Sequence, residues 1–162
     1  MGMKFNADEV LEMAVKIEQS GAVFYRTAAE KKKDAEGIDF LKELAVMEDE
    51  HEKTFQQMRD DLSDDEKAEN TYDPAGEISM YLEAMADAHG GEGSPKAADS
   101  LTGNESLAEI LDIAIGLEKE SILFYIGLQD MVPERLGRDK IANIIAEERS
   151  HITTLAQKIK SI

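Results

Sequence analysis

Glu48-Asp49-Glu50-His51 recurs one hundred residues later in the chain as Glu148-Arg149-Ser150-His151. In each copy a glutamate stands three positions before a histidine. On a helix, residues three apart lie on one face, so both side chains can reach the same metal ion. The repeat therefore predicts two equivalent helices, each directing one carboxylate and one imidazole toward a shared site.

A second pair of glutamates repeats at the same spacing. Glu18 follows Ala14-Val15-Lys16-Ile17, and Glu118 follows Ala114-Ile115-Gly116-Leu117. Each glutamate lies within an apolar stripe of helical period, where a charge without a partner is costly. With the two histidine motifs, this gives four glutamates and two histidines in two equivalent halves, a ligand set for two metal ions. Mixed oxygen and nitrogen ligation favours iron or manganese and also accommodates zinc.

The glutamates of this ligand set have two roles. A carboxylate can bridge two cations, whereas an imidazole supplies one nitrogen to one cation. We assign Glu48 and Glu148 as the bridges. The other four ligands complete one ion in each half: Glu18 with His51, and Glu118 with His151. The alternative is a plain helical bundle with four surface carboxylates and two core histidines.

Two tyrosines accompany the ligands. Tyr25 and Tyr125 stand seven residues after Glu18 and Glu118, which places them two turns along the same helix face. Two interpretations are open at this point. Each tyrosine is either a core aromatic whose hydroxyl binds a buried acceptor, or a catalytic group that donates to a ligating carboxylate or to a bound oxidant.

Helical periodicity predicts a single all-α domain over residues 1–162, with long helices at about 7–33, 38–62, 106–131 and 138–160. Met47 is placed among the buried positions of the second helix. Gly37 and Gly137 lie in short links, so each pair of helices forms an antiparallel hairpin. Residues 63–105 form a long crossover with a short helix at 74–88. The predicted architecture is a four-helix bundle of two equivalent hairpins.

Composition excludes several classes of protein. The formal net charge of the 162 residues is -17, which argues against nucleic acid or an anionic membrane surface as a partner. The chain has no cysteine, so disulfides, iron–sulfur ligation and thiol catalysis are excluded. No apolar run is long enough for a membrane span and no signal peptide is recognisable, so a cytoplasmic location is expected.

At these residues the chain resembles the rubrerythrins, within the ferritin-like superfamily. The resemblance covers the four main helices, and its matching elements are Glu18 with Tyr25, Glu48-x-x-His51, Glu118 with Tyr125, and Glu148-x-x-His151. It implies a ferritin-like bundle with a non-haem centre of two iron ions. It also implies an enzyme that reduces hydrogen peroxide, with dioxygen as another oxidant, and that works as a homodimer or larger homo-oligomer.

Two departures from the rubrerythrin pattern affect this expectation. Typical rubrerythrins feed electrons to the centre from a rubredoxin domain with four cysteines, so a chain without cysteine needs an external rubredoxin-like donor. Rubrerythrins also tend to carry a further carboxylate where this chain has Ser121. The remaining ligand set is closer to a symmetric bacterioferritin-type ferroxidase site. Alternative functions are therefore an iron-oxidising or iron-storage protein, and a metal-stabilised structural module.

Overall fold

The computed structural model describes residues 7–68, 75–77, 80–81, 84, 96–130, 132 and 134–162. The regular secondary structure of these described residues is helical, and no strand occurs among them. The four long helices are α1 (Ala7–Lys31), α2 (Ile38–Asp60), α6 (Leu107–Gln129) and α7 (Arg138–Ser161). The short elements are α3 (Asp64–Ala68), α5 (Lys96–Ser100) and the 3-10 turn η1 (Glu134–Leu136).

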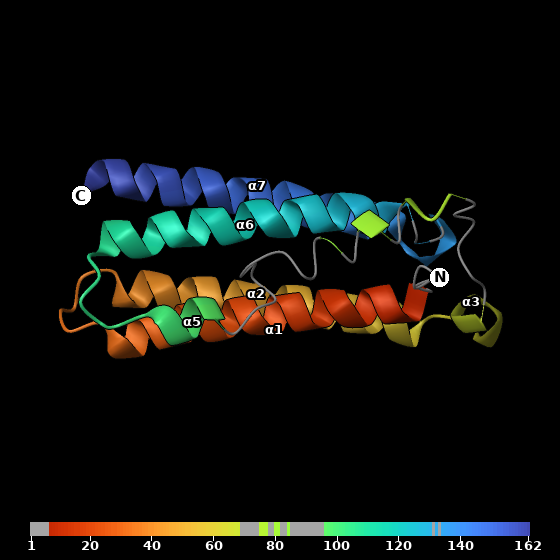
Figure 1. Ribbon diagram of the computed structural model, residues 1–162, viewed down its shortest axis with the longest axis horizontal. Helices are drawn as coiled ribbons and strands as arrows, with labels where there is room; N and C mark the ends of the chain where they lie inside the picture. Colours follow the sequence, from red (N-terminus) through yellow and green to blue (C-terminus); the bar gives the residue numbers. More distant parts are fainter. Residues whose placement is uncertain are drawn as a thin grey trace.

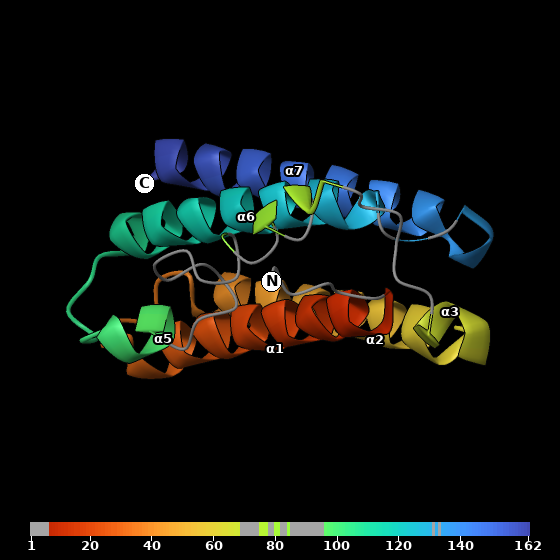
Figure 2. The same cartoon turned by 45° about the vertical axis from the view of Figure 1, so that its right-hand side comes forward.

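The long helices form two antiparallel hairpins that lie side by side. Figures 1 and 2 show α1 beside α2 in one hairpin and α6 beside α7 in the other, with all four axes running along the length of the molecule. This is the all-α four-helix bundle that the sequence predicts. In the described part of the chain, no helix is both long enough and apolar enough to cross a membrane.

The ends of the helices follow local sequence signals. Ser106 caps α6: its side chain accepts a hydrogen bond from the Glu109 amide, and the Glu109 carboxylate accepts one from the Ser106 amide. Gly37 precedes α2 in the left-handed conformation, with φ of 75°. A Cβ atom at Gly37 would lie 2.6 Å from Cδ2 of Leu107. Glycine is therefore required both by the backbone and by the contact with the second hairpin.

The connection between the hairpins differs from the prediction at one end. Residues 96–100 form the short helix α5, where the sequence predicted crossover without a helix. Lys31 is the last residue of α1, and its Nζ donates a hydrogen bond to the Leu101 carbonyl at 2.7 Å. This contact holds the segment that contains α5 against α1. The predicted 74–88 helix lies mostly outside the described residues, of which 77, 80, 81 and 84 are helical.

The apolar core is divided into two clusters along the bundle. One cluster joins the N-terminal half of α1 to the C-terminal half of α2, and includes Val10, Leu11, Phe55, Met58, Phe124 and Ile141. The other occupies the opposite end, and includes Phe24, Leu41, Leu44, Leu107, Leu111 and Leu155. Between the clusters, all four helices carry polar side chains toward the bundle axis.

Met47 corrects one core assignment made from the sequence. Its side chain is 40% exposed, whereas Met58 on the same helix is fully buried. Glu48, the next residue, faces the bundle axis and is 0% exposed. Since neighbouring residues on a helix are turned about 100° apart, the Met47 side chain points away from the bundle axis and toward the surface.

Candidate metal centre

Six polar side chains form a buried layer at the middle of the bundle. Each is at most 4% exposed, and they are the six predicted ligands: Glu18, Glu48, His51, Glu118, Glu148 and His151. Helices α1 and α6 each supply one glutamate, and α2 and α7 each supply a glutamate and a histidine. The sequence places these residues on one helix face, and the packing of the two hairpins brings the four faces together.

The six residues form two overlapping groups with the geometry of a metal site. One contains Glu18, Glu48, His51 and Glu148, and the other contains Glu48, Glu118, Glu148 and His151. Within each group, one ligand atom from every residue lies within 4.8 Å of the others. Glu48 and Glu148 belong to both groups, as expected of bridging carboxylates. The remaining glutamate and histidine of each group come from the predicted pairs.

Both histidines present the same nitrogen to the carboxylates. Nδ1 of His51 lies 2.7 Å from Oε1 of Glu148 and 3.4 Å from Oε2 of Glu18. Nδ1 of His151 lies 3.1 Å from Oε2 of Glu148 and 3.7 Å from Oε1 of Glu118. The two rings are 5.5 Å apart and nearly parallel, at 13°. The two halves therefore direct their imidazoles in the same way.

The two tyrosines connect the hairpins across the site. Tyr25 on α1 donates its hydroxyl to Oε1 of Glu118 on α6, at 2.6 Å. Tyr125 on α6 donates in return to Glu18 on α1. Both tyrosines are at most 1% exposed. Each is thus a core aromatic with a satisfied hydroxyl, and its acceptor is one of the predicted ligands.

The pKa values of Glu48, Glu118 and Glu148 are shifted in this buried layer. Burial raises the pKa of Glu48 well above its usual range, and the negative charges of Glu18 and Glu148 raise it further. Burial also raises the pKa of Glu118, to about 8. For Glu148, burial alone acts upward, but hydrogen bonds to Glu118 and to the two histidines hold its pKa below the usual range.

The buried carboxylates in turn raise the pKa of both histidines. Burial alone lowers the pKa of His51, but the hydrogen bond and the charge of Glu148 raise it to about 9. Burial acts in the same direction on His151, and Glu118 and Glu148 together raise its pKa to about 9. In the protein without metal, protons therefore supply the positive charge that the carboxylates need.

The donor set fits two divalent cations. Neither carboxylate oxygen of Glu48 accepts a hydrogen bond from any residue that the structure describes. A buried carboxylate in this condition is costly unless a cation meets it. The four carboxylates of the layer balance the charge of two divalent ions, and each ion would also receive one imidazole nitrogen. Iron, manganese and zinc all accept such ligands.

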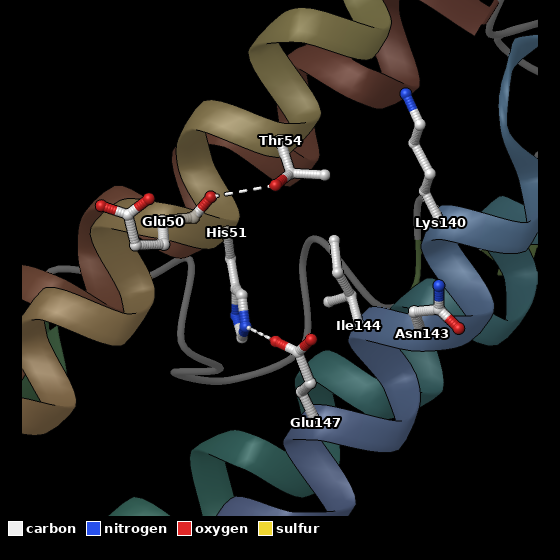
Figure 3. Close-up of a pocket in the computed structure, with 7 residues that line it drawn as sticks. All are labelled: Glu50, His51, Thr54, Lys140, Asn143, Ile144 and Glu147. Carbon is white, nitrogen blue, oxygen red and sulfur yellow. Dashed lines mark hydrogen bonds and ion pairs between the residues drawn. The ribbon is translucent and has the colours of Figure 1, made fainter.

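Glu147 contacts the outer side of the site and was not among the residues predicted from the sequence. Its Oε2 lies 2.8 Å from Nε2 of His51, and its side chain is 59% exposed. Figure 3 shows this contact between His51 on α2 and Glu147 on α7, and both residues line a pocket of about 300 Å³. The residue stands next to Glu148 in the sequence, and no prediction was made for it. No local motif distinguishes it.

Ser121 occupies the position where a further carboxylate was considered. It is buried, and its Oγ donates to the Leu117 carbonyl at 3.2 Å, within its own helix. Glu120 belongs to neither of the two ligand groups. Helix α6 therefore contributes one carboxylate, Glu118, to the groups, just as α1 contributes one.

The chain is similar to known proteins in two respects. The model of the rubrerythrin family matches residues 9–159. A solved structure from Thermotoga maritima, described as a ferritin-like diiron-carboxylate protein, is 25% identical, with a TM-score of 0.68. The match covers 99% of this chain and 98% of that one. A comparison of the chain with curated proteins found no match. The bundle therefore has the ferritin-like fold that the sequence predicted.

Proposed function

The chain belongs to the rubrerythrin family, and from this we propose that it is a non-haem di-iron oxidoreductase that reduces hydrogen peroxide. Dioxygen is the other oxidant of the proposal. The observation that carries it is the pair of buried ligand groups that share Glu48 and Glu148. Two cations held by common carboxylates lie close enough to act on one small molecule together.

The reaction requires two electrons and two protons: hydrogen peroxide, two electrons and two protons give two molecules of water. When bound, the iron pair would supply the two electrons. The protein's own residues hold the ions and the protons. Tyr25 and Tyr125 each keep a proton on the hydroxyl oxygen, directed at Glu118 and Glu18. In the proposal these hydroxyls fix the two carboxylates and stand ready to donate toward the oxidant.

The reduced state must be restored from outside the described bundle. The chain has no cysteine and so no rubredoxin-type iron of its own. The proposed donor is therefore a separate rubredoxin-like protein, and the proposed assembly is a homodimer or larger homo-oligomer. The acidic charge of the chain, -17, favours a donor whose docking face carries positive charge.

A second candidate function is oxidation of ferrous iron for binding or storage. The observation that favours it is the symmetric ligand set, with one carboxylate from α1, one from α6 and Ser121 at the position of a further carboxylate. Storage requires a large shell that accumulates far more than two irons per chain. Light scattering that gives a small dimer, together with at most two irons per chain, would reject storage. A third candidate, a metal-stabilised structural module, requires loss of thermal stability without metal and no redox reaction.

The test is steady-state reduction of hydrogen peroxide by the iron-loaded protein with a rubredoxin-like protein as donor. Repeated turnover is expected from the wild type and none from Glu148→Ala, because Glu148 belongs to both groups. Glu43→Ala is the matched control, since Glu43 is an exposed carboxylate on α2 and should turn over as the wild type does. Equal turnover by Glu148→Ala and the wild type would contradict the proposal.

A further inference from the structure

The two histidines differ in what lies on their outer side. Nε2 of His51 is 2.8 Å from the Glu147 carboxylate. Nε2 of His151 has no hydrogen-bond partner among the residues that the structure describes. The difference arises at a position where the two halves of the repeat are not alike: Met47 stands one hundred residues before Glu147. A thioether does not replace a carboxylate as an acceptor.

This difference affects which nitrogen is available to a metal ion. A neutral imidazole carries its hydrogen on one nitrogen and offers the lone pair of the other. A carboxylate at Nε2 keeps the hydrogen there and leaves the Nδ1 lone pair free, facing the ligand carboxylates. Glu147 supplies this carboxylate to His51. Among the described residues, no side chain does the same for His151.

Two polar residues that line the pocket beside His51 have apolar counterparts in the other half. The pocket beside His51 is lined by Glu50, Thr54, Lys140, Asn143, Ile144 and Glu147 (Figure 3). In the other half Lys140 is replaced by Phe40, and Glu147 by Met47. Among the described residues, a carboxylate therefore lies beside Nε2 of His51, and none lies beside Nε2 of His151.

We propose that Glu147 is a positioning residue for His51, and that it makes the His51 half of the centre the tighter of two unequal metal positions. This deepens the proposed di-iron function, on which it rests for the identity of the metal. The affinity difference itself requires only that the six buried residues bind divalent cations. Outer hydrogen-bond partners of histidine ligands change metal affinity by about 10- to 100-fold. Since Glu147 is 59% exposed, we expect a change near about tenfold.

The test is anaerobic titration with Co(II), which reports its coordination by absorption and undergoes no turnover. Each half is measured alone by removing the other histidine. In the His151→Ala background, Glu147→Met should weaken Co(II) binding by about tenfold. In the His51→Ala background, the same change should have no effect. Equal effects in the two backgrounds would overturn the proposal, because they would indicate a general loss of negative charge.

Two control variants separate hydrogen bonding from charge. Glu147→Gln keeps an oxygen that can accept from Nε2 and should retain most of the affinity. Glu50→Gln removes a charge from the same pocket without touching His51 and should leave the affinity unchanged. If Glu147→Gln and Glu50→Gln both weaken binding as much as Glu147→Met, charge alone explains the effect and the proposal fails.

A gain-of-function variant keeps the test valid even where a histidine variant does not fold. Met47 is exposed, so Met47→Glu should fold, and it should tighten the weaker of the two Co(II) positions of the otherwise native chain by about tenfold. If Met47→Glu and Glu147→Met each bind both Co(II) ions with the affinities of the wild type, the inference is overturned, even if peroxide is reduced. Shifted Co(II) affinities without peroxide turnover support the inference and reject the proposed function.

Discussion

The two hairpins are alike at the axis of the bundle and unlike at its surface. Hairpin α1–α2 and hairpin α6–α7 carry the same ligands at the same spacing, and their tyrosines bind each other's glutamates. Outside this layer several equivalent positions differ. Glu147 has Met47 as its counterpart, and the Asp8–Arg59 ion pair of the first hairpin is replaced by Ala108 and Ile159 in the second. The metal-binding chemistry accounts for what is shared, and the surface is where the halves differ.

The largest expected effect comes from breaking the carboxylates that both halves share. Glu148→Ala should lose both metal ions, whereas Glu18→Ala should lose the ion of one half and retain the other. Metal content per chain, measured on reconstituted protein, checks this. Equal loss in the two variants would contradict the assignment of Glu148 as a bridge. In the absence of metal, Glu148→Ala should also be less stable than the wild type, because it removes the buried carboxylate that pairs with His51 and His151.

The two glycines that begin the second helix of each hairpin provide a matched comparison of stability. Gly37 and Gly137 both have positive φ, at 75° and 97°, so alanine should cost about 1–2 kcal/mol of unfolding free energy at either. At Gly37 the new Cβ also meets the buried Leu107, which adds about 1–3 kcal/mol. At Gly137 it meets the flexible Lys140 side chain. Denaturant unfolding should rank Gly37→Ala as the less stable, and the reverse order would contradict the packing.

The tyrosines test whether the cross-connection serves the reaction or the core. Tyr25→Phe leaves Glu118 without this donor and should cost about 1–3 kcal/mol of stability. The proposed role also requires a fall in kcat/KM of about tenfold. Tyr125→Phe should behave in the same way, because it binds Glu18 across the site. Unchanged turnover with reduced stability would leave the tyrosines as core residues only.

The smallest expected effect is that of the ion pair present in the first hairpin alone. Arg59 donates to both carboxylate oxygens of Asp8, at 2.8 and 3.2 Å. Asp8→Asn should therefore cost about 0.2–1 kcal/mol. The hydrogen bond from Arg59 lowers the pKa of Asp8, so this contribution is complete above the unfolded pKa of about 4. It is lost as the pH falls through the lower, folded value. Thermal unfolding at neutral and acidic pH should show the difference between variant and wild type disappear in acid.

Much of the fold was accessible from the sequence because its signals are local and repeated. The capping box at Ser106, the break at Gly37 and the spacing of Glu48 and His51 each depend on residues within one or two helical turns. The repeat then supplied the relation between distant helices. Met47 was placed wrongly because its spacing from other apolar residues fits a helical stripe, although its direction lies just outside the core.

The features that the sequence did not predict depend on contacts between hairpins. Glu147 approaches His51 only because α7 packs beside α2, and its own neighbours give it the appearance of a solvated carboxylate. Helix α5 is held by Lys31, which is 70 residues from the carbonyl it binds. Such contacts leave no periodic pattern in the sequence, since each joins single residues of separate elements.

The di-iron proposal is tested most directly by the metal content per chain, followed by anaerobic loading with Fe(II) and a pulse of hydrogen peroxide. We expect two irons per chain that peroxide oxidises and that an added donor reduces again through repeated cycles. Zinc that remains tightly bound, or iron that peroxide oxidises once and that does not return to the ferrous state, would contradict it.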